Sequence, residues 1–67
     1  MEFIKITLEA ARRNAGLTQK QVAEMLNVSV QSIIAWEKEP YKITIGNAIR
    51  LAELYHISID NLIFMAE

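Results

Sequence analysis

The chain has 67 residues, which is enough for one domain with one small core, and its lack of cysteine excludes disulfides and thiolate metal sites. No apolar run is long enough for a signal peptide or a membrane span, so a cytoplasmic protein with residues 1–67 as a single domain is expected. Seven Lys and Arg against eight Asp and Glu give a net charge of −1, which argues against nucleic-acid binding by bulk charge alone.

The first two predicted helices follow each other closely. Residues 8–15 carry apolar side chains at helical spacing, with Thr7 as N-cap and Gly16 as the left-handed residue that ends the helix. Thr18-Gln19-Lys20-Gln21 then forms a capping box and begins a second helix that ends near Leu26. The side chains of the second helix that are expected to face inward are Val22, Ala23 and Leu26.

A short turn, Asn27-Val28-Ser29, leads into a third predicted helix over about residues 30–38, with Ser29 as its N-cap. Asn27 tolerates the left-handed region, and the turn is too tight for two antiparallel helices. A small residue where the helices cross, Ala23, and apolar residues six and nine positions after Asn27, Ile33 and Trp36, complete the pattern. This arrangement is typical of a helix-turn-helix.

Two further helices are predicted towards the end of the chain. Thr44 precedes a fourth helix over residues 45–55, and Ser58 precedes a short fifth helix over residues 59–64. Because no segment shows a strand signal, the predicted fold class is all-α, a bundle of five helices. The residues expected to face inward on these helices are Ala48, Ile49, Leu51, Ala52, Tyr55, Leu62 and Ile63.

Several segments extend the pattern beyond the two central helices. They are Arg12 with Gly16-Leu17-Thr18-Gln19, Val22-Ala23-Glu24-Met25-Leu26, Val28-Ser29-Val30-Gln31-Ser32-Ile33, Trp36-Glu37, and Leu51-Ala52 through Ile57-Ser58-Ile59-Asp60. Over nearly its whole length the chain resembles the phage repressor/Cro family, also called the xenobiotic-response-element type. The resemblance implies a lambda-repressor-like bundle, double-stranded DNA as partner, a homodimer, and transcriptional regulation, with repression favoured over activation.

The same resemblance suggests which side chains read the bases. In this family the third helix enters the major groove with its N-terminal residues against base edges. Gln31 can pair with adenine through two hydrogen bonds, and Val30 and Ala35 can pack against thymine methyl groups. A solvated amide at Gln31 and core packing at Val30 are the alternatives. The expected base contacts are Val30, Gln31, Ser32 and Ala35.

Phosphate contacts are expected from helix N-termini and from nearby cations. Gln19 matches the position at which the family clamps the DNA backbone, and Lys38 and Lys42 bracket the loop after the third helix. Gly46 has no side chain to obstruct a phosphate, although it could simply relieve crowding. The full expected set is Gln19, Lys20, Lys38, Lys42, Gly46 and Asn47.

Arg12 and Glu37 are expected to have a structural role instead. The matching family positions form an internal ion pair between the first helix and the end of the third, so the resemblance implies the same pair here. If the pair is well buried, removing one partner costs on the order of 3–5 kcal/mol, because the other charge is stranded.

The loop after the third helix departs from the family pattern. Glu39 stands where glycine is usual and Ile43 where proline is usual. Pro40 disfavours α geometry at Glu39, so the third helix is expected to end there with a different loop. The carboxylate of Glu39 near the DNA backbone predicts modest and strongly salt-sensitive affinity. His56 replaces a residue that is often glycine or asparagine, and no chemistry is assigned to it.

Other classes of function are weighed against this one. An enzyme is not expected, and neither is a metal or a cofactor, because there is no cysteine nucleophile, second histidine or phosphate-binding glycine loop. The serious alternative is a protein-interaction module on the same fold, an antirepressor or antitoxin-like partner of another regulator. The acidic balance, Glu39 and the apolar residues Val30, Ile34 and Ala35 favour it.

Dimerisation is expected for a protein that recognises two-fold symmetric operators. Two apolar patches could support it: Phe3-Ile4-Ile6 near the start of the chain and Phe64-Met65 near its end. Both could also simply close the core. The second patch is the favoured dimer contact.

Overall fold

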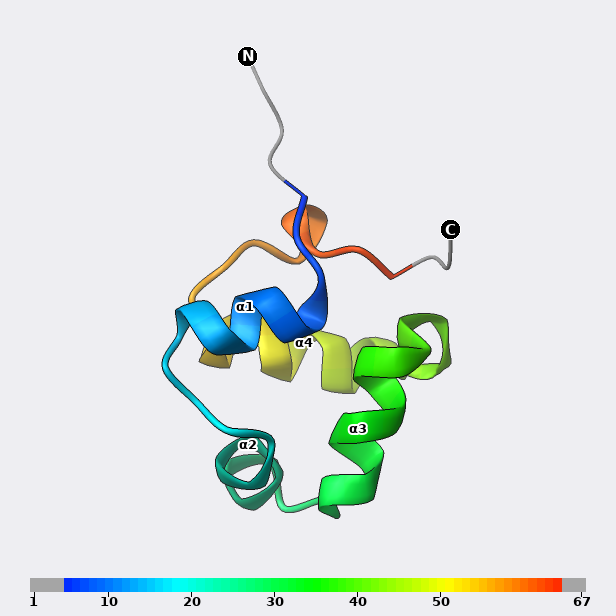
Figure 1. The fold of residues 1–67 in the computed structure, drawn as a ribbon. Coiled ribbons are helices and arrows are strands. Elements are labelled where there is room, and N and C mark those ends of the chain that lie inside the picture. Colours follow the sequence, from blue (N-terminus) through cyan, green and yellow to red (C-terminus); the bar gives the residue numbers. More distant parts are fainter. Residues whose placement is uncertain (1–4, 65–67) are drawn as a thin grey trace.

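The computed structural model describes residues 5–64, which form four α-helices and two 3₁₀ turns. The elements are α1 (Leu8–Asn14), α2 (Gln19–Leu26), α3 (Val30–Lys38), η1 (Pro40–Lys42), α4 (Ile45–Leu54) and η2 (Ile59–Asn61). In Figure 1, α2 and α3 lie at the bottom, joined by a short turn, and α1 and α4 lie above them. Within the described residues, no helix has the length and apolar character needed to cross a membrane.

Each α-helix begins at a hydroxyl residue whose side chain accepts a backbone hydrogen bond from the first turn. At α2 the predicted capping box is complete: Thr18 Oγ1 accepts from Gln21 N at 3.1 Å, and Gln21 Oε1 accepts from Thr18 N at 2.8 Å. The predicted helix starts are therefore confirmed. The four caps are Thr7, Thr18, Ser29 and Thr44.

Three helices end in the same way, with one residue in the left-handed region. After α2, Asn27 has φ 59°. Asn27 N donates to Glu24 O at 3.2 Å and Val28 N donates to Ala23 O at 3.0 Å. This is the Schellman pair of hydrogen bonds, which satisfies carbonyls at the helix end. Equivalent pairs follow α1 and α4, and the left-handed residues there are Gly16 (φ 76°) and His56 (φ 56°).

Replacing Gly16 with alanine is expected to lower the free energy of unfolding by about 1 kcal/mol. A Cβ at Gly16 would contact nothing within 4 Å, so the loss comes from the left-handed backbone that alanine adopts poorly. Gly46→Ala is the matched control: Gly46 is the second residue of α4, a Cβ there also meets nothing, and alanine should stabilise the helix by up to about 1 kcal/mol. Denaturant unfolding of both variants measures the difference, and shifts of the same sign would contradict this account.

The core lies where α2 and α3 cross beneath α1 and α4. Val22 is 0% exposed, Ala23 3% and Ile33 1%, so the predicted inward face of the helix-turn-helix is confirmed. Ile49 was predicted to face the core, and this is wrong because it is 45% exposed. It lies four residues after Ile45, which is 73% exposed, so the two form an apolar stripe on the outer side of α4.

The predicted fifth helix over residues 59–64 is not confirmed. The chain forms only the 3₁₀ turn η2 and then becomes extended, so that Leu62 pairs with Ile6 in a single parallel bridge. Ile6 N donates to Asn61 O and Ile63 N donates to Ile6 O, both at 2.9 Å. β-branched and Asx residues are poor helix formers over so short a segment, and the bridge satisfies the backbone instead. Phe3, Ile4 and Met65, named above as patch residues, lie outside the described residues.

The predicted end of α3 is confirmed, and a turn that was not predicted follows it. Glu39 has φ −133° and ψ 75°, which lies outside the α region that a following proline disfavours. Pro40 then starts η1, in which Lys42 N donates to Glu39 O at 3.0 Å and Ile43 N donates to Pro40 O at 3.2 Å. This tight turn reverses the chain between α3 and α4.

Candidate nucleic-acid interface

The outward face of α3 is the first part of the candidate site. Gln31 and Ala35 are exposed, whereas Val30 and Ser32 are half-buried. Val30 packs against the core, and the Ser32 hydroxyl lies 3.1 Å from Ser29 Oγ. Of the residues predicted to contact bases, Gln31 and Ala35 therefore present the most free surface. Among the described residues, none makes a hydrogen bond to the Gln31 side chain.

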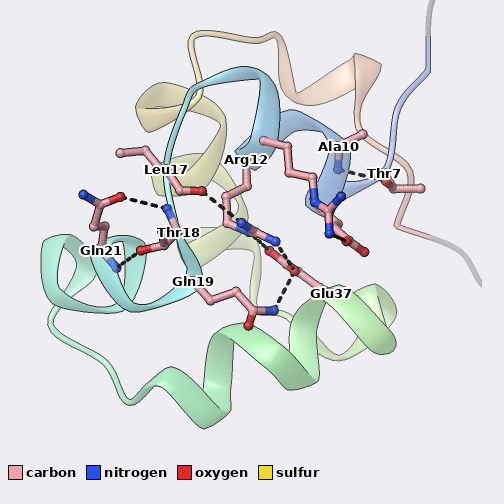
Figure 2. Close-up of polar contacts among 10 residues, drawn as sticks. Thr7, Ala10, Arg12, Leu17, Thr18, Gln19, Gln21 and Glu37 are labelled. Atoms are coloured by element: carbon pink, nitrogen blue, oxygen red, sulfur yellow. Dashed lines mark hydrogen bonds and ion pairs between the residues drawn. The ribbon is translucent and has the colours of Figure 1, made fainter.

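Arg12 and Glu37 come together between α1 and the last turn of α3, away from the outward face (Figure 2). Arg12 Nε donates to Glu37 Oε2 at 2.6 Å and Arg12 Nη2 to Oε1 at 3.3 Å. The two side chains are 9% and 7% exposed. The hydrogen bond to Glu37 raises the pKa of Arg12 above its usual value despite the opposing effect of burial, so the guanidinium stays charged. A third donor, Arg12 Nη1, reaches Leu17 O at 2.9 Å.

Gln19, predicted as a phosphate contact, joins this pair. Gln19 Nε2 donates to Glu37 Oε1 at 2.9 Å, which links the first residue of α2 to the last turn of α3 (Figure 2). Sequence reasoning did not find this hydrogen bond. The available signal was weak, because Gln19 and Glu37 are eighteen positions apart and no local pattern connects them. We refer to Arg12, Gln19 and Glu37 as the buried polar cluster.

The predicted cations lie on exposed surface, but they are not equivalent. Lys20 and Lys38 are exposed. Lys42 Nζ lies 3.0 Å from Glu39 Oε1, and Tyr41 Oη donates to Glu39 Oε2 at 2.9 Å. The hydrogen bond from Lys42, followed by that from Tyr41, lowers the pKa of Glu39, and the bond to Glu39 raises the pKa of Lys42. Lys42, which was predicted to contact a phosphate, is therefore paired with Glu39 inside the chain.

Gly46 and Asn47 open α4, as predicted. Gly46 is exposed and Asn47 is half-buried. The backbone amide of Asn47 is already donated to Thr44 Oγ1 at 3.3 Å, so it is not free for a phosphate. Asn47 Oδ1 accepts from Arg50 Nη1 at 3.4 Å, which leaves its amide nitrogen as the free end.

Arg50 was not singled out from the sequence. Arg50 Nη2 donates to Leu26 O at 2.8 Å and so joins α4 to the last residue of α2. A cation on the exposed side of an amphipathic helix gives no sign of such a long-range partner. The contact supports the turn between α2 and α3 from the side of α4.

An apolar hollow of about 310 Å³ lies beside this region, at the start of α4. Tyr41 and Ile45, which border it, are among the most exposed large apolar residues of the described chain, at 53% and 73%. Phe64, from the predicted dimer patch, also borders it. The lining residues are Pro40, Tyr41, Ile43, Ile45, Ala48 and Phe64.

Acidic and histidine side chains do not gather into a metal site within residues 5–64, where no group of three or more potential ligands is found.

Comparisons with known proteins point to one family. A family model described as helix-turn-helix matches residues 8–62. The HTH-type transcriptional regulator ImmR of Bacillus subtilis (strain 168) is 34% identical over 56 residues, which cover 84% of this chain and 44% of that protein. The chain therefore spans less than half the length of this curated relative. No solved structure matches the chain.

Proposed function

Because this chain belongs to the phage repressor/Cro-type helix-turn-helix family, we propose that it binds double-stranded DNA as a transcriptional regulator, acting as a repressor. Residues 1–67 act as one DNA-binding domain without catalytic activity. The relative ImmR is itself described as a transcriptional regulator, which supports this reading. The observation that carries the proposal is the exposed outer face of α3, where Gln31 is free of internal partners among the described residues.

In the proposed complex α3 lies in the major groove, with Val30, Gln31, Ser32 and Ala35 against base edges. Gln31 pairs with adenine, and Ala35 packs against a thymine methyl group. Lys20 and Lys38 meet phosphates on either side. Asn47 adds its free amide nitrogen, and Gly46 lets the backbone approach closely.

The net charge of −1 does not prevent this binding, because binding depends on which charges face the DNA and not on their sum over the chain. Glu37 is paired with Arg12 and largely buried, and Glu39 is paired with Lys42. Two further cations, Lys20 on α2 and Lys38 on α3, are exposed. Placement of charge therefore replaces the basic balance that DNA-binding domains usually show.

Selection of bound duplexes from a random pool, followed by titration of the best one, tests the proposal. A regulator should enrich one short motif and bind it at least about a thousand times more tightly than unrelated duplex. An interaction-only module, the alternative reading, would enrich no motif and bind all duplexes as weakly as its charge dictates. That second result would overturn the proposed function.

Glu39→Gln is expected to strengthen DNA binding by up to about tenfold. It should also steepen the plot of log affinity against log salt concentration by the amount that about one added phosphate contact gives. The reason is that Lys42, released from Glu39, becomes available to a phosphate, and a repulsive charge is lost. Affinities for the selected duplex at several salt concentrations measure both effects. Glu53→Gln, which removes the same charge in the last turn of α4, is the control, and equal gains from both variants would contradict the role of Lys42.

We further propose that the protein forms a homodimer through the face that carries Phe64 and the apolar hollow. Phe64 is half-buried, and the exposed residues Ile45 and Tyr41 continue the apolar surface around it. A second copy would cover this surface, which a domain with so small a core can use for stability.

Ile45→Glu is therefore expected to convert the dimer to a monomer in sedimentation equilibrium, because it places a charge in the centre of the apolar surface. Met25→Glu is the control: Met25 on α2 is also exposed, at 56%, but does not border the hollow. A dimer that survives Ile45→Glu, or one that is lost with Met25→Glu, would place the contact elsewhere.

A further inference from the structure

The buried polar cluster does more than hold three helices together, because it determines which end of the Gln19 amide faces which way. The two ends of a carboxamide are nearly identical in shape, but only the nitrogen can donate to a carboxylate. Glu37 Oε1, 2.9 Å away, therefore keeps Nε2 inward and selects one of the two amide orientations. The acceptor is itself held in place, since Arg12 bonds both oxygens of Glu37.

This arrangement offers Gln19 an acceptor without adding net negative charge near DNA. The Arg12 guanidinium neutralises Glu37, and both side chains are at least nine-tenths buried. Arg12 also donates to Leu17 O, immediately before the N-cap of α2. All three nitrogens of its guanidinium therefore bond groups of the protein, and Arg12 is not available as a phosphate ligand. The half-buried Gln19 is the one member of the cluster that extends towards the surface.

We propose that Glu37 is a positioning residue for DNA binding: it takes one hydrogen of the Gln19 amide nitrogen and thereby directs the second hydrogen to a DNA phosphate. An amide nitrogen carries two hydrogens, so both bonds can exist at once. Gln19 enters the complex already ordered and loses less side-chain entropy than a free glutamine would. This inference rests on the proposed function.

A double-mutant cycle on the full chain tests the proposal. Glu37 is removed together with its partner, as Arg12→Met/Glu37→Leu, so that no charge is stranded and the domain can still fold. Gln19→Ala should weaken binding of the selected duplex by roughly tenfold in the natural background. It should have almost no effect in the Met/Leu background, where Gln19 is no longer oriented.

Gln31→Ala provides the matched control, because Gln31 does not contact the cluster. Its effect should be the same in both backgrounds. Equal losses from Gln19→Ala in both backgrounds, or no loss in either, would overturn the positioning role while leaving the proposed function intact. Failure of the natural protein to prefer any duplex would instead remove the proposed function, and this inference with it.

NMR of the natural protein gives an answer that does not depend on how the variants fold. In the free protein, one of the two side-chain amide protons of Gln19 should be protected from solvent exchange by its hydrogen bond to Glu37. The other should shift when the selected duplex is added. Rapid solvent exchange of both protons, with no response of either to DNA, would overturn the proposal.

Discussion

Replacing Glu37 with alanine is expected to lower the free energy of unfolding by about 3 kcal/mol, the largest stability effect of any single substitution proposed for this chain. The change strands the charge of Arg12, a residue that is only 8% exposed, and removes the acceptor of Gln19. We take the lower end of the range for buried pairs, because the cluster lies close to the surface. For a domain of this size the loss corresponds to a fall in melting temperature of roughly 15 °C.

Denaturant unfolding measures this effect, and two comparisons show its cause. Arg12→Met/Glu37→Leu should lose much less than Glu37→Ala, because the double replacement leaves no unpaired charge. Glu39→Ala, at a carboxylate that lies on the surface, should change stability little. If Glu37→Ala proved as mild as Glu39→Ala, the cluster would be an ordinary surface ion pair.

Gln31→Ala is expected to weaken binding to the selected duplex by roughly 1–3 kcal/mol and to relax the preference at one base pair. Gln31 is exposed on α3, so its removal should leave the fold intact and take away only the paired hydrogen bonds to a base. Competition titrations with duplexes altered at each position in turn measure both the loss and its location.

Lys20→Ala serves as the contrast, because loss of a phosphate contact should weaken binding to all duplexes equally. It should also reduce the slope of log affinity against log salt concentration by about one. Should Gln31→Ala lower every affinity equally and leave the sequence preference unchanged, the side chain would belong with the backbone contacts. Base reading would then have to come from other residues.

Much of this fold follows from local signals in the sequence. The hydroxyl caps at Thr7, Thr18, Ser29 and Thr44 are each made by a side chain that bonds an amide three residues away, so the signal and the structure are equally local. The left-handed residues Gly16 and Asn27 end helices for similarly local reasons. The inward face of α2 follows from helical periodicity alone.

What could not be predicted depends on contacts between distant segments. The last turn of the fold pairs Leu62 with Ile6, and this pairing replaces the expected fifth helix. Ile49 is exposed because no element within residues 5–64 covers that side of α4, and helical periodicity alone does not indicate this. The roles of Gln19 and Arg50 likewise depend on partners eighteen and twenty-four positions away.

The central claim, that the exposed face of α3 reads base edges in the major groove, is tested most directly with base analogues in the selected duplex. Uracil in place of thymine removes only a major-groove methyl group, and 7-deazaadenine removes only a major-groove acceptor. We expect one of each to weaken binding severalfold, with the adenine effect absent in Gln31→Ala. Unchanged affinity with every major-groove analogue, together with sensitivity to minor-groove changes, would contradict the account.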